Sequence, residues 1–355
     1  MLEPPKNRWH YRHYSFPDPL VINHPIFVFS LSVFVFFSSV SCSRYTTARL
    51  DENSRLVDLL PIEVDSRNPE RHEFGRLTLL NAFELRSRDP RFGGLSGLSI
   101  GADGKLYAVS DRGYWVSAQM NFDAEHRLID LTDWNIQPIL STSGSPVTHP
   151  LTDAEALARA PDGSFLVGFE QLHRMWRYAP PPATFSSLPV PIPLPPQLAN
   201  APSDGGLESI TVLPDGKILA ITEQFANADG TFKGWLLQDN YFAELSYRPS
   251  NGFFATDCAA LKNGDVIVLE RRYRPLGIFS ARIKLVRSKD IIAGAKLLGE
   301  ELLRLQSPLE VDNFEGVAVQ EDPITGTRIY IISDDNYHPL ERTLLLQFRL
   351  SPTEN

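Results

Sequence analysis

Acidic residues flank five short hairpin patterns in this sequence. Each pattern has an apolar run, a glycine-containing turn and a second apolar run. The residues that precede the first run and follow the second are, in chain order, Ser96 and Asp111, Glu155 and Glu170, Glu208 and Glu223, Asp257 and Glu270, and Glu315 and Asp334. Nine of these ten are carboxylates, although Asp and Glu make up only 43 of the 355 residues. The flanking positions are therefore candidates for a functional site.

Hairpin geometry would bring these flanking residues together. In a hairpin, the start of the first strand lies beside the end of the second strand, at the end away from the turn. If the first strands line one channel, all the flanks meet at one mouth. Carboxylates crowded in this way must bind cations or keep protons that they would otherwise lose. The alternative is that these acids accept hydrogen bonds from backbone N–H groups of neighbouring sheets.

Oxygen ligands without cysteine or clustered histidine favour a hard cation over zinc. We expect Ca²⁺, with Mg²⁺ and Mn²⁺ as alternatives, held by Glu155, Glu208, Asp257, Glu315 and Asp334. Asp111 or Glu223 would act as the catalytic base, and among the histidines His338 is the one candidate base.

Two arginines lie beside the acids that follow the second runs. Arg112 and Arg271 carry planar, permanently charged donors, so either could hold the anionic part of a substrate. The alternative is that each pairs with the acids next to it.

The spacing of the hairpins predicts the architecture that positions these residues. The turn glycines fall at positions 104, 163, 216, 264 and 326. A period near fifty with one hairpin per repeat is typical of four-stranded propeller blades. Asp-Gly or Asn-Gly at four of the turns favours two-residue turns in which both residues have positive φ. Strands at 75–80 and 343–350 would pair in one further blade. The sequence thus predicts an all-β propeller of six blades, closed by its N- and C-terminal strands, with five or seven blades as alternatives.

Two stretches between the hairpins have a different character. Nine prolines lie between positions 180 and 202. Proline is excluded from central strands, so this tract predicts an extended loop between blades. The stretch 290–304 is compatible with a short helix.

The N-terminus predicts export. Residues 1–43 contain a basic leader, an apolar run over 26–37 and small residues after it, which is the layout of a signal peptide or of an uncleaved N-terminal anchor. Cys42 sits at the expected cleavage point, so a lipid on Cys42 is a further mode of attachment to a membrane. We expect a linker over 44–73, the propeller over 74–350 and a tail over 351–355, in a periplasmic or secreted protein that such an anchor would hold at the membrane.

The formal net charge of −9 argues against a nucleic-acid partner, because such partners call for a basic surface. Among the remaining classes, we expect a monomer that acts on a small anionic substrate.

Several motifs together resemble a known family. They are Gly-Leu-Ser-Gly-Leu at 94–98, Ser-Asp-Arg-Gly at 110–113, Asp-Ala-Glu-Ala-Leu at 153–157, Gly-Leu-Glu-Ser-Ile at 206–210, Asn-Phe-Glu-Gly-Val at 313–317 and Ser-Asp-Asp-Asn at 333–336. The sequence over 74–350 is similar to the phytase-like domain family, exported bacterial proteins described as having esterase-like activity. The resemblance implies a propeller and Ca²⁺-assisted hydrolysis of phosphoesters or esters.

Two other functions are compatible with the same mouth. A looser likeness to gluconolactonase and paraoxonase propellers, which hold Ca²⁺ in the channel and hydrolyse lactones, implies a lactonase. The third interpretation is a non-catalytic propeller that holds a ligand or a partner protein, because a fold does not by itself specify a function.

Overall fold

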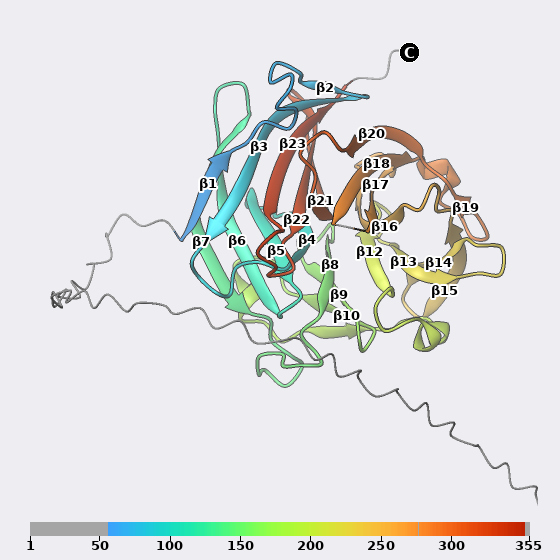
Figure 1. Ribbon diagram of the computed structural model, residues 1–355. Helices are drawn as coiled ribbons and strands as arrows, with labels where there is room; N and C mark the ends of the chain where they lie inside the picture. Colours follow the sequence, from blue (N-terminus) through green and yellow to red (C-terminus); the bar gives the residue numbers. More distant parts are fainter. Residues whose placement is uncertain (1–55, 276, 352–355) are drawn as a thin grey trace, which may run out of the picture. The chain divides into compact units, whose positions relative to one another are not determined.

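The computed structural model describes residues 56–275 and 277–351, and the expected signal peptide or anchor over 1–43 lies outside them. The described residues form five β-sheets around a common axis (Figure 1). The predicted all-β propeller is confirmed. The predicted blade number of six is wrong, because the propeller has five blades.

Each blade has four strands that follow one another from the axis outward. The innermost strands are β4 (Leu95–Ile100), β8 (Ala154–Arg159), β12 (Leu207–Val212), β16 (Phe254–Ala260) and β21 (Asn313–Asp322). The second strands are β5 (Lys105–Ser110), β9 (Phe165–Phe169), β13 (Ile218–Ala226), β17 (Val266–Arg274) and β22 (Gly326–Asp334). Each innermost strand packs beside the innermost strands of both neighbouring blades, and β21 lies beside β4, which closes the ring.

The outer strands complete the blades, which we number 1 to 5 in the order of their innermost strands. The third strands are β6 (Tyr114–Phe122), β10 (Arg174–Tyr178), β14 (Phe232–Gln238), β18 (Ile278–Val286) and β23 (Thr343–Leu350). The fourth strands are β7 (Leu128–Pro138), β11 (Val190–Ile192), β15 (Tyr241–Tyr247), β20 (Glu300–Gln306) and β3 (Leu77–Ser87). The short β19 (Lys296–Leu297) pairs in parallel with β15 and joins blade 4 to blade 3.

The terminal strands explain the difference between six blades and five. Up to residue 351, where the description ends, the last hairpin is followed by one more strand, β23, and the N-terminal β3 pairs with β23 and takes the fourth position of blade 5. In Figure 1 the blue-to-cyan β3 lies directly beside the red β23. The terminal strands therefore complete an existing repeat and do not form a separate blade. Within the expected linker, β1 (Val57–Pro61) pairs with the outer side of β3, and β2 (Glu73–Phe74) forms a short hairpin with the start of β3.

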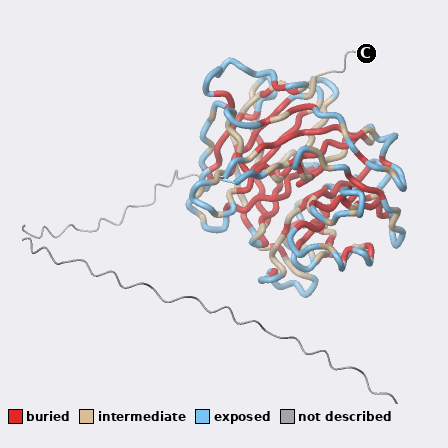
Figure 2. The backbone as a smooth tube through the Cα atoms, turned by 45° about the vertical axis from the view of Figure 1, so that its right-hand side comes forward, coloured by how far each residue is buried: buried red, intermediate tan, exposed pale blue. Residues whose placement is uncertain are grey.

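Five hydrophobic clusters hold the blades together, one at each seam between neighbours. Each cluster combines side chains from two adjacent sheets, and burial follows the sheets while the loops are exposed (Figure 2). One member from each side of each seam illustrates this: Trp115 and Phe165, Met175 and Trp235, Tyr247 and Val268, Leu269 and Phe348, and Leu98 and Tyr330. Five seams filled by large buried side chains fix the innermost strands, and hence the residues at their ends.

The hairpin turns differ in type from the prediction. At the first turn the N–H of Gly104 donates to the carbonyl of Gly101 at 3.1 Å. Gly104 has φ +77°, whereas Asp103 is not among the residues with positive φ. This geometry is a type I turn closed by a glycine in the left-handed region, and only the glycine requires that region. The prediction that both turn residues have positive φ was wrong.

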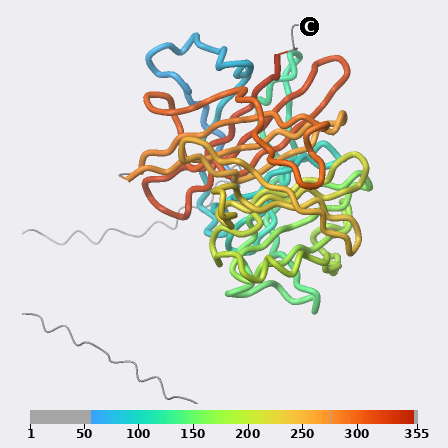
Figure 3. The backbone as a smooth tube through the Cα atoms, turned by 90° about the vertical axis from the view of Figure 1, so that its right-hand side faces the viewer, coloured from blue at the N-terminus to red at the C-terminus, as the bar shows by residue number. Residues whose placement is uncertain are grey.

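Two further predictions about local structure were wrong in part. The proline tract contains β11, which pairs with β10 as the exposed edge of blade 2, a position in which proline is tolerated. It also contains the 3₁₀ turns η1 (Ala183–Phe185) and η2 (Pro196–Asn200). The stretch 290–304 holds the end of the 3₁₀ turn η3 (Ser288–Asp290), β19 and most of β20 instead of a helix, and these strands lie in the yellow-to-orange part that faces the viewer in Figure 3. Over 56–275 and 277–351, we find no helix with the length and apolarity to cross a bilayer.

Candidate functional site: an acidic mouth

Every innermost strand carries a β-bulge near its start. In each hairpin the register slips by one residue at the equivalent place, so that one residue of the innermost strand has no partner on the second strand. The bulged residues are Ser96, Glu155, Glu208, Thr256 and Glu315. A bulge re-aims the side chain of its extra residue and commonly occurs beside functional sites. The repeat therefore places five side chains equivalently around one end of the channel.

A second set of side chains comes from the ends of the second strands. The residue before each bulge pairs with a residue of the second strand. The residue that follows this partner in the sequence belongs to the second set. Its members are Asp111, Glu170, Glu223, Arg271 and Asp334. We call the bulged residues and this second set together the acidic mouth. Seven of its ten members are carboxylates. The expected convergence holds for blades 1, 2, 3 and 5, and blade 4 departs from it.

In blade 4 the expected residues are out of step with the other blades. Thr256 occupies the bulge, so Asp257 lies one residue past it. Asp257 is fully buried, and its carboxylate accepts hydrogen bonds from the N–H groups of Val317 at 2.7 Å and Cys258 at 2.8 Å. Burial raises the pKa of Asp257 well above its usual range. For this residue the geometry corresponds to the backbone-bonding alternative.

Glu270 also lies outside the acidic mouth. It is fully buried and accepts a hydrogen bond from the hydroxyl of Tyr247 at 2.8 Å, and the guanidinium of Arg282 donates to its other oxygen. These residues fill the seam between blades 3 and 4. The one-residue offset turns Glu270 into the seam, because successive side chains of a strand point to opposite faces, and it brings Arg271 to the mouth in its place.

Arg271 lies among the carboxylates and links three blades. Its guanidinium donates to Glu223 of blade 3 at 3.0 Å, to Asn313 of blade 5 at 2.6 Å and to Glu315 of blade 5. Burial lowers the pKa of Arg271, but the charges of Glu315, Glu223 and Glu208 outweigh it and raise that pKa. Arg271 is therefore a permanent counter-cation inside the mouth. A substrate anion, which Arg271 was expected to hold, would have to compete with Glu223, Asn313 and Glu315 for the guanidinium.

The three glutamates at the bulges interact with one another. The hydroxyl of Ser96 donates to Glu315 at 3.2 Å, and Asn313 donates to the same carboxylate at 2.8 Å. Burial raises the pKa of Glu155, and Glu315 raises it further. Burial likewise raises the pKa of Glu208, and the charge of Glu223 raises it further. The mouth therefore favours protons or cations on these three side chains.

Three acids of the second set, Asp111, Glu170 and Asp334, also have raised pKa values. Burial, with the charge of Asp153, raises the pKa of Asp111 to about 7. The backbone N–H groups of Gly205 and Gly206 donate to the carboxylate of Glu170 and lower its pKa. Burial outweighs them and raises this pKa to about 7. Burial raises the pKa of Asp334 well above its usual range, and the charge of Glu315 adds to this effect. A carboxyl group with a pKa near 7 can exchange a proton at neutral pH.

Arg112 lies at the rim of the mouth. Its side chain is exposed and stacks on the ring of Tyr337, with 3.2 Å from the guanidinium carbon to the ring centroid. The hydroxyl of Tyr337 is fixed by the carbonyl of Gly93 at 2.9 Å. Stacking orients a guanidinium and leaves its N–H donors available for a ligand. His338, by contrast, is exposed, and its ring lies 3.9 Å from the carboxylate of Glu341.

The mouth offers the type of ligand that a hard cation prefers, but its side chains are not arranged around a common point as metal ligands are. Carboxylate oxygens of Glu155, Glu208, Glu315 and Asp334 are the ligand type that Ca²⁺ prefers. Within the described part of the chain, however, no group of three or more His, Cys, Asp or Glu side chains is arranged to hold a metal ion. Because Arg271 binds Glu315 and Glu223, a cation would have to compete with its guanidinium for these oxygens.

A five-bladed propeller with an acidic mouth is thus the class that fold and site define. The sequence model of the phytase-like family, described as "Esterase-like activity of phytase", matches residues 90–337. The chain therefore belongs to the phytase-like family, which confirms the resemblance noted in its motifs.

Other comparisons give weaker likenesses. No curated protein matches the sequence significantly. Among solved structures, the PQQ-bound aldose sugar dehydrogenase of Streptomyces coelicolor is similar at 12% identity and TM-score 0.43, covering 79% of this chain and 99% of that chain. A gluconolactonase of Xanthomonas campestris is similar at 11% identity and TM-score 0.39, covering 82% of this chain and 97% of that chain. Both TM-scores lie below 0.5.

Proposed function

We propose that this protein hydrolyses ester or phosphoester bonds of small anionic substrates at the acidic mouth. The observation that carries the proposal is the convergence of seven carboxylates at one end of the channel, built by bulges that recur in all five blades, with Arg271 bound to two of them. A pure binding surface has little need for such a concentration of like charge, because each carboxylate raises the pKa of its neighbours. Proton exchange in hydrolysis makes direct use of it.

The residues of the chain divide into roles by their contacts. Asp111, with its pKa raised to about 7, is the general acid or base that exchanges a proton with water or with the leaving group. Arg112 at the rim holds the anionic part of the substrate, since its guanidinium is held by ring stacking on Tyr337. Arg271 positions Glu223 and Glu315 through its hydrogen bonds.

A divalent cation is part of the proposal. Glu155, Glu208 and Glu315 would hold Ca²⁺, with Asp334 close by, and the bound ion would supply polarisation of the substrate oxygen. Proton exchange and binding of the substrate anion are the roles of Asp111 and Arg112, as described above.

A substrate panel tests the proposal. Purified protein is assayed with p-nitrophenyl phosphate, p-nitrophenyl acetate and a γ-lactone, each with Ca²⁺ and with chelator. Turnover of the phosphate or the acetate is expected. Turnover of the lactone alone would favour a lactonase, and no turnover with any substrate would contradict the proposal in favour of a binding propeller.

A further inference from the structure

The opposite end of the channel has a cavity of its own. It lies at the turn end of the innermost strands and has a volume of about 550 Å³. Pockets that hold small organic molecules are typically of this size. A smaller space of about 80 Å³ continues from it between the innermost strands.

One charged residue interrupts an otherwise apolar ring in this cavity. Four positions after each bulge, the innermost strands place Ile100, Arg159, Val212, Ala260 and Val319, and all five line the cavity. Arg159 is the last residue of β8. The other four equivalents are apolar, so the position does not require a polar side chain for the fold.

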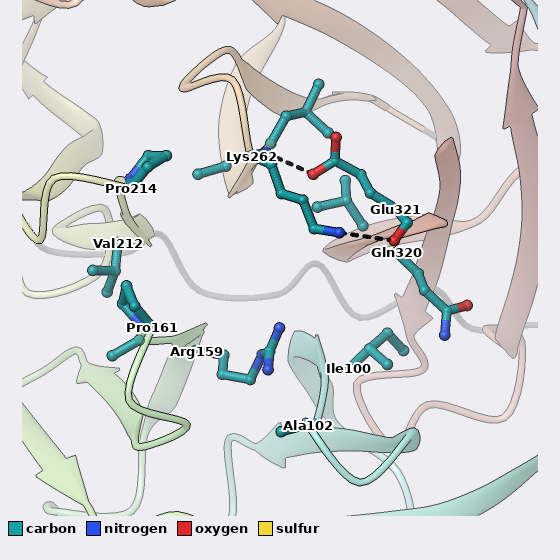
Figure 4. Close-up of a pocket in the computed structure, with 14 residues that line it drawn as sticks. Ile100, Ala102, Arg159, Pro161, Val212, Pro214, Lys262, Gln320 and Glu321 are labelled. Atoms are coloured by element: carbon teal, nitrogen blue, oxygen red, sulfur yellow. Dashed lines mark hydrogen bonds between the residues drawn. The ribbon is translucent and has the colours of Figure 1, made fainter. Parts of the chain in front are cut away.

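The guanidinium of Arg159 has no direct partner among the described residues. It points into the cavity between the apolar walls (Figure 4). Within 56–275 and 277–351, no hydrogen bond or ion pair joins it to another residue. Burial lowers the pKa of Arg159, and the charge of Asp103 offsets only part of that effect. Arg159 is nonetheless solvent-exposed, so its N–H donors are free to bind the carboxylate or phosphate of a ligand in the cavity.

The other charges that line the cavity leave this guanidinium uncompensated. Lys262 donates from its backbone N–H to the carboxylate of Glu321 at 2.6 Å and from its ammonium to the carbonyl of Glu321 at 3.2 Å (Figure 4). Lys262 and Glu321 balance each other in charge, and Arg159 leaves a net positive charge on the lining. The side chains that line this cavity therefore carry a net positive charge, whereas those of the acidic mouth carry a net negative charge.

We propose that the turn end of the channel is a binding site for a small organic anion with an apolar body. The carboxylate or phosphate group of the ligand would pair with Arg159, and its apolar part would contact Ile100, Val212 and Val319. The site is separate from the acidic mouth and does not depend on the function proposed for that mouth.

Calorimetric titration of the full-length protein tests this site. Hexanoate is the probe, with acetate as the anion that lacks an apolar body and 1-hexanol as the neutral chain. Hexanoate is expected to bind more tightly than either. Arg159→Gln should weaken hexanoate binding by about tenfold, and Arg349→Gln, which changes an exposed arginine on β23, should leave it unchanged.

Three results would overturn the proposal. They are no detectable binding of hexanoate to the wild type, equal binding by Arg159→Gln at an unchanged melting temperature, and loss of binding in Arg112→Gln. The last result would place the probe at the acidic mouth. Ala260→Leu, which fills the cavity without changing a charge, provides an independent check, and it should also weaken binding.

Discussion

Arg271 on β17 donates to the carboxylate of Glu315 on β21, although the two residues are 44 positions apart in the sequence. The same guanidinium reaches Glu223 on β13, so that one side chain ties the second strands of blades 3 and 4 to the innermost strand of blade 5. The pair lies within the acidic mouth. It gives the crowded carboxylates a counter-charge that the fold itself supplies.

Removing this counter-charge should destabilise the protein. Arg271→Gln leaves Glu223 and Glu315 facing each other without it, and we expect a loss of about 2 kcal/mol in the free energy of unfolding. Glu315→Gln in the same chain should recover part of that loss, because one unpaired charge is removed. Urea unfolding of the wild type, both single variants and the double variant measures the coupling. Strictly additive losses would contradict the role of the pair.

Ca²⁺ should compete with Arg271 for the same oxygens. We expect millimolar Ca²⁺ to raise the melting temperature of the wild type, because only the folded state presents the site. The rise should be larger in Arg271→Gln, where the guanidinium no longer occupies Glu315. Glu208→Gln should reduce it in both backgrounds. Thermal melts with Ca²⁺, Mg²⁺, Mn²⁺ and chelator check this, and an absence of response to every ion in both backgrounds would remove the cation from the proposal.

Glu170 should make the protein more stable in mild acid than at alkaline pH. Its pKa is raised to about 7 in the fold, so the folded state holds a proton that the unfolded chain releases near pH 4. This stabilisation is complete below the unfolded pKa and is lost as the pH rises through about 7. Between pH 5 and pH 8 it amounts to about 2 kcal/mol. Urea unfolding at both values should show this difference shrinking in Glu170→Gln, and an unchanged difference would refute the assignment.

Asp257 should be a structural residue. Asp257→Ala would leave the N–H groups of Val317 and Cys258 without their acceptor inside the protein, at a cost of about 2–4 kcal/mol. Asp257→Asn keeps one acceptor oxygen and should cost less. The control is Asp58→Ala, at an exposed position of the edge strand β1. Chemical denaturation ranks the three variants, and equal stability of Asp257→Ala and the control would show that the buried bonds contribute nothing.

Much of the architecture could be predicted from the hairpin repeat, because apolar runs around a glycine turn specify local strand pairing. The number of blades could not. The pairing of the two terminal strands, which closes the ring, was predicted and is confirmed. Their place was not predicted, because the outer strands have no motif of their own that shows to which repeat they belong.

The candidate site could be predicted for blades 1, 2, 3 and 5. For blade 4 the predicted residues were displaced by one position along the chain. Ser96, Glu155 and Glu208 each precede their turn glycine by eight positions, and Thr256 precedes Gly264 by the same number. Because position 257 is acidic, Asp257 was aligned with the acids of the other repeats in place of Thr256, although the constant spacing to the turn glycine was visible in the sequence. The same rule identifies Arg271, seven positions after Gly264, as the equivalent of Asp111, Glu170 and Glu223.

Other features of the mouth had no signal in the sequence. Asn313 contacts Arg271 and Glu315 from a position two residues before the bulge, where the other repeats have different residues. Tyr337 reaches the mouth from a loop that follows β22 and stacks under Arg112. Contacts of this kind depend on how loops from separate blades pack, and no local pattern reports them.

The most direct measurement is kcat/KM of the wild type and of Asp111→Asn for whichever p-nitrophenyl ester or phosphate the wild type hydrolyses. The amide keeps the size of the side chain and cannot exchange the proton, so we expect kcat/KM to fall by roughly 100-fold or more. Asp58→Asn should stay at the wild-type value, and all three proteins should unfold cooperatively. A wild type that hydrolyses none of these substrates, or an Asp111→Asn variant as active as the wild type, would contradict hydrolysis at the acidic mouth.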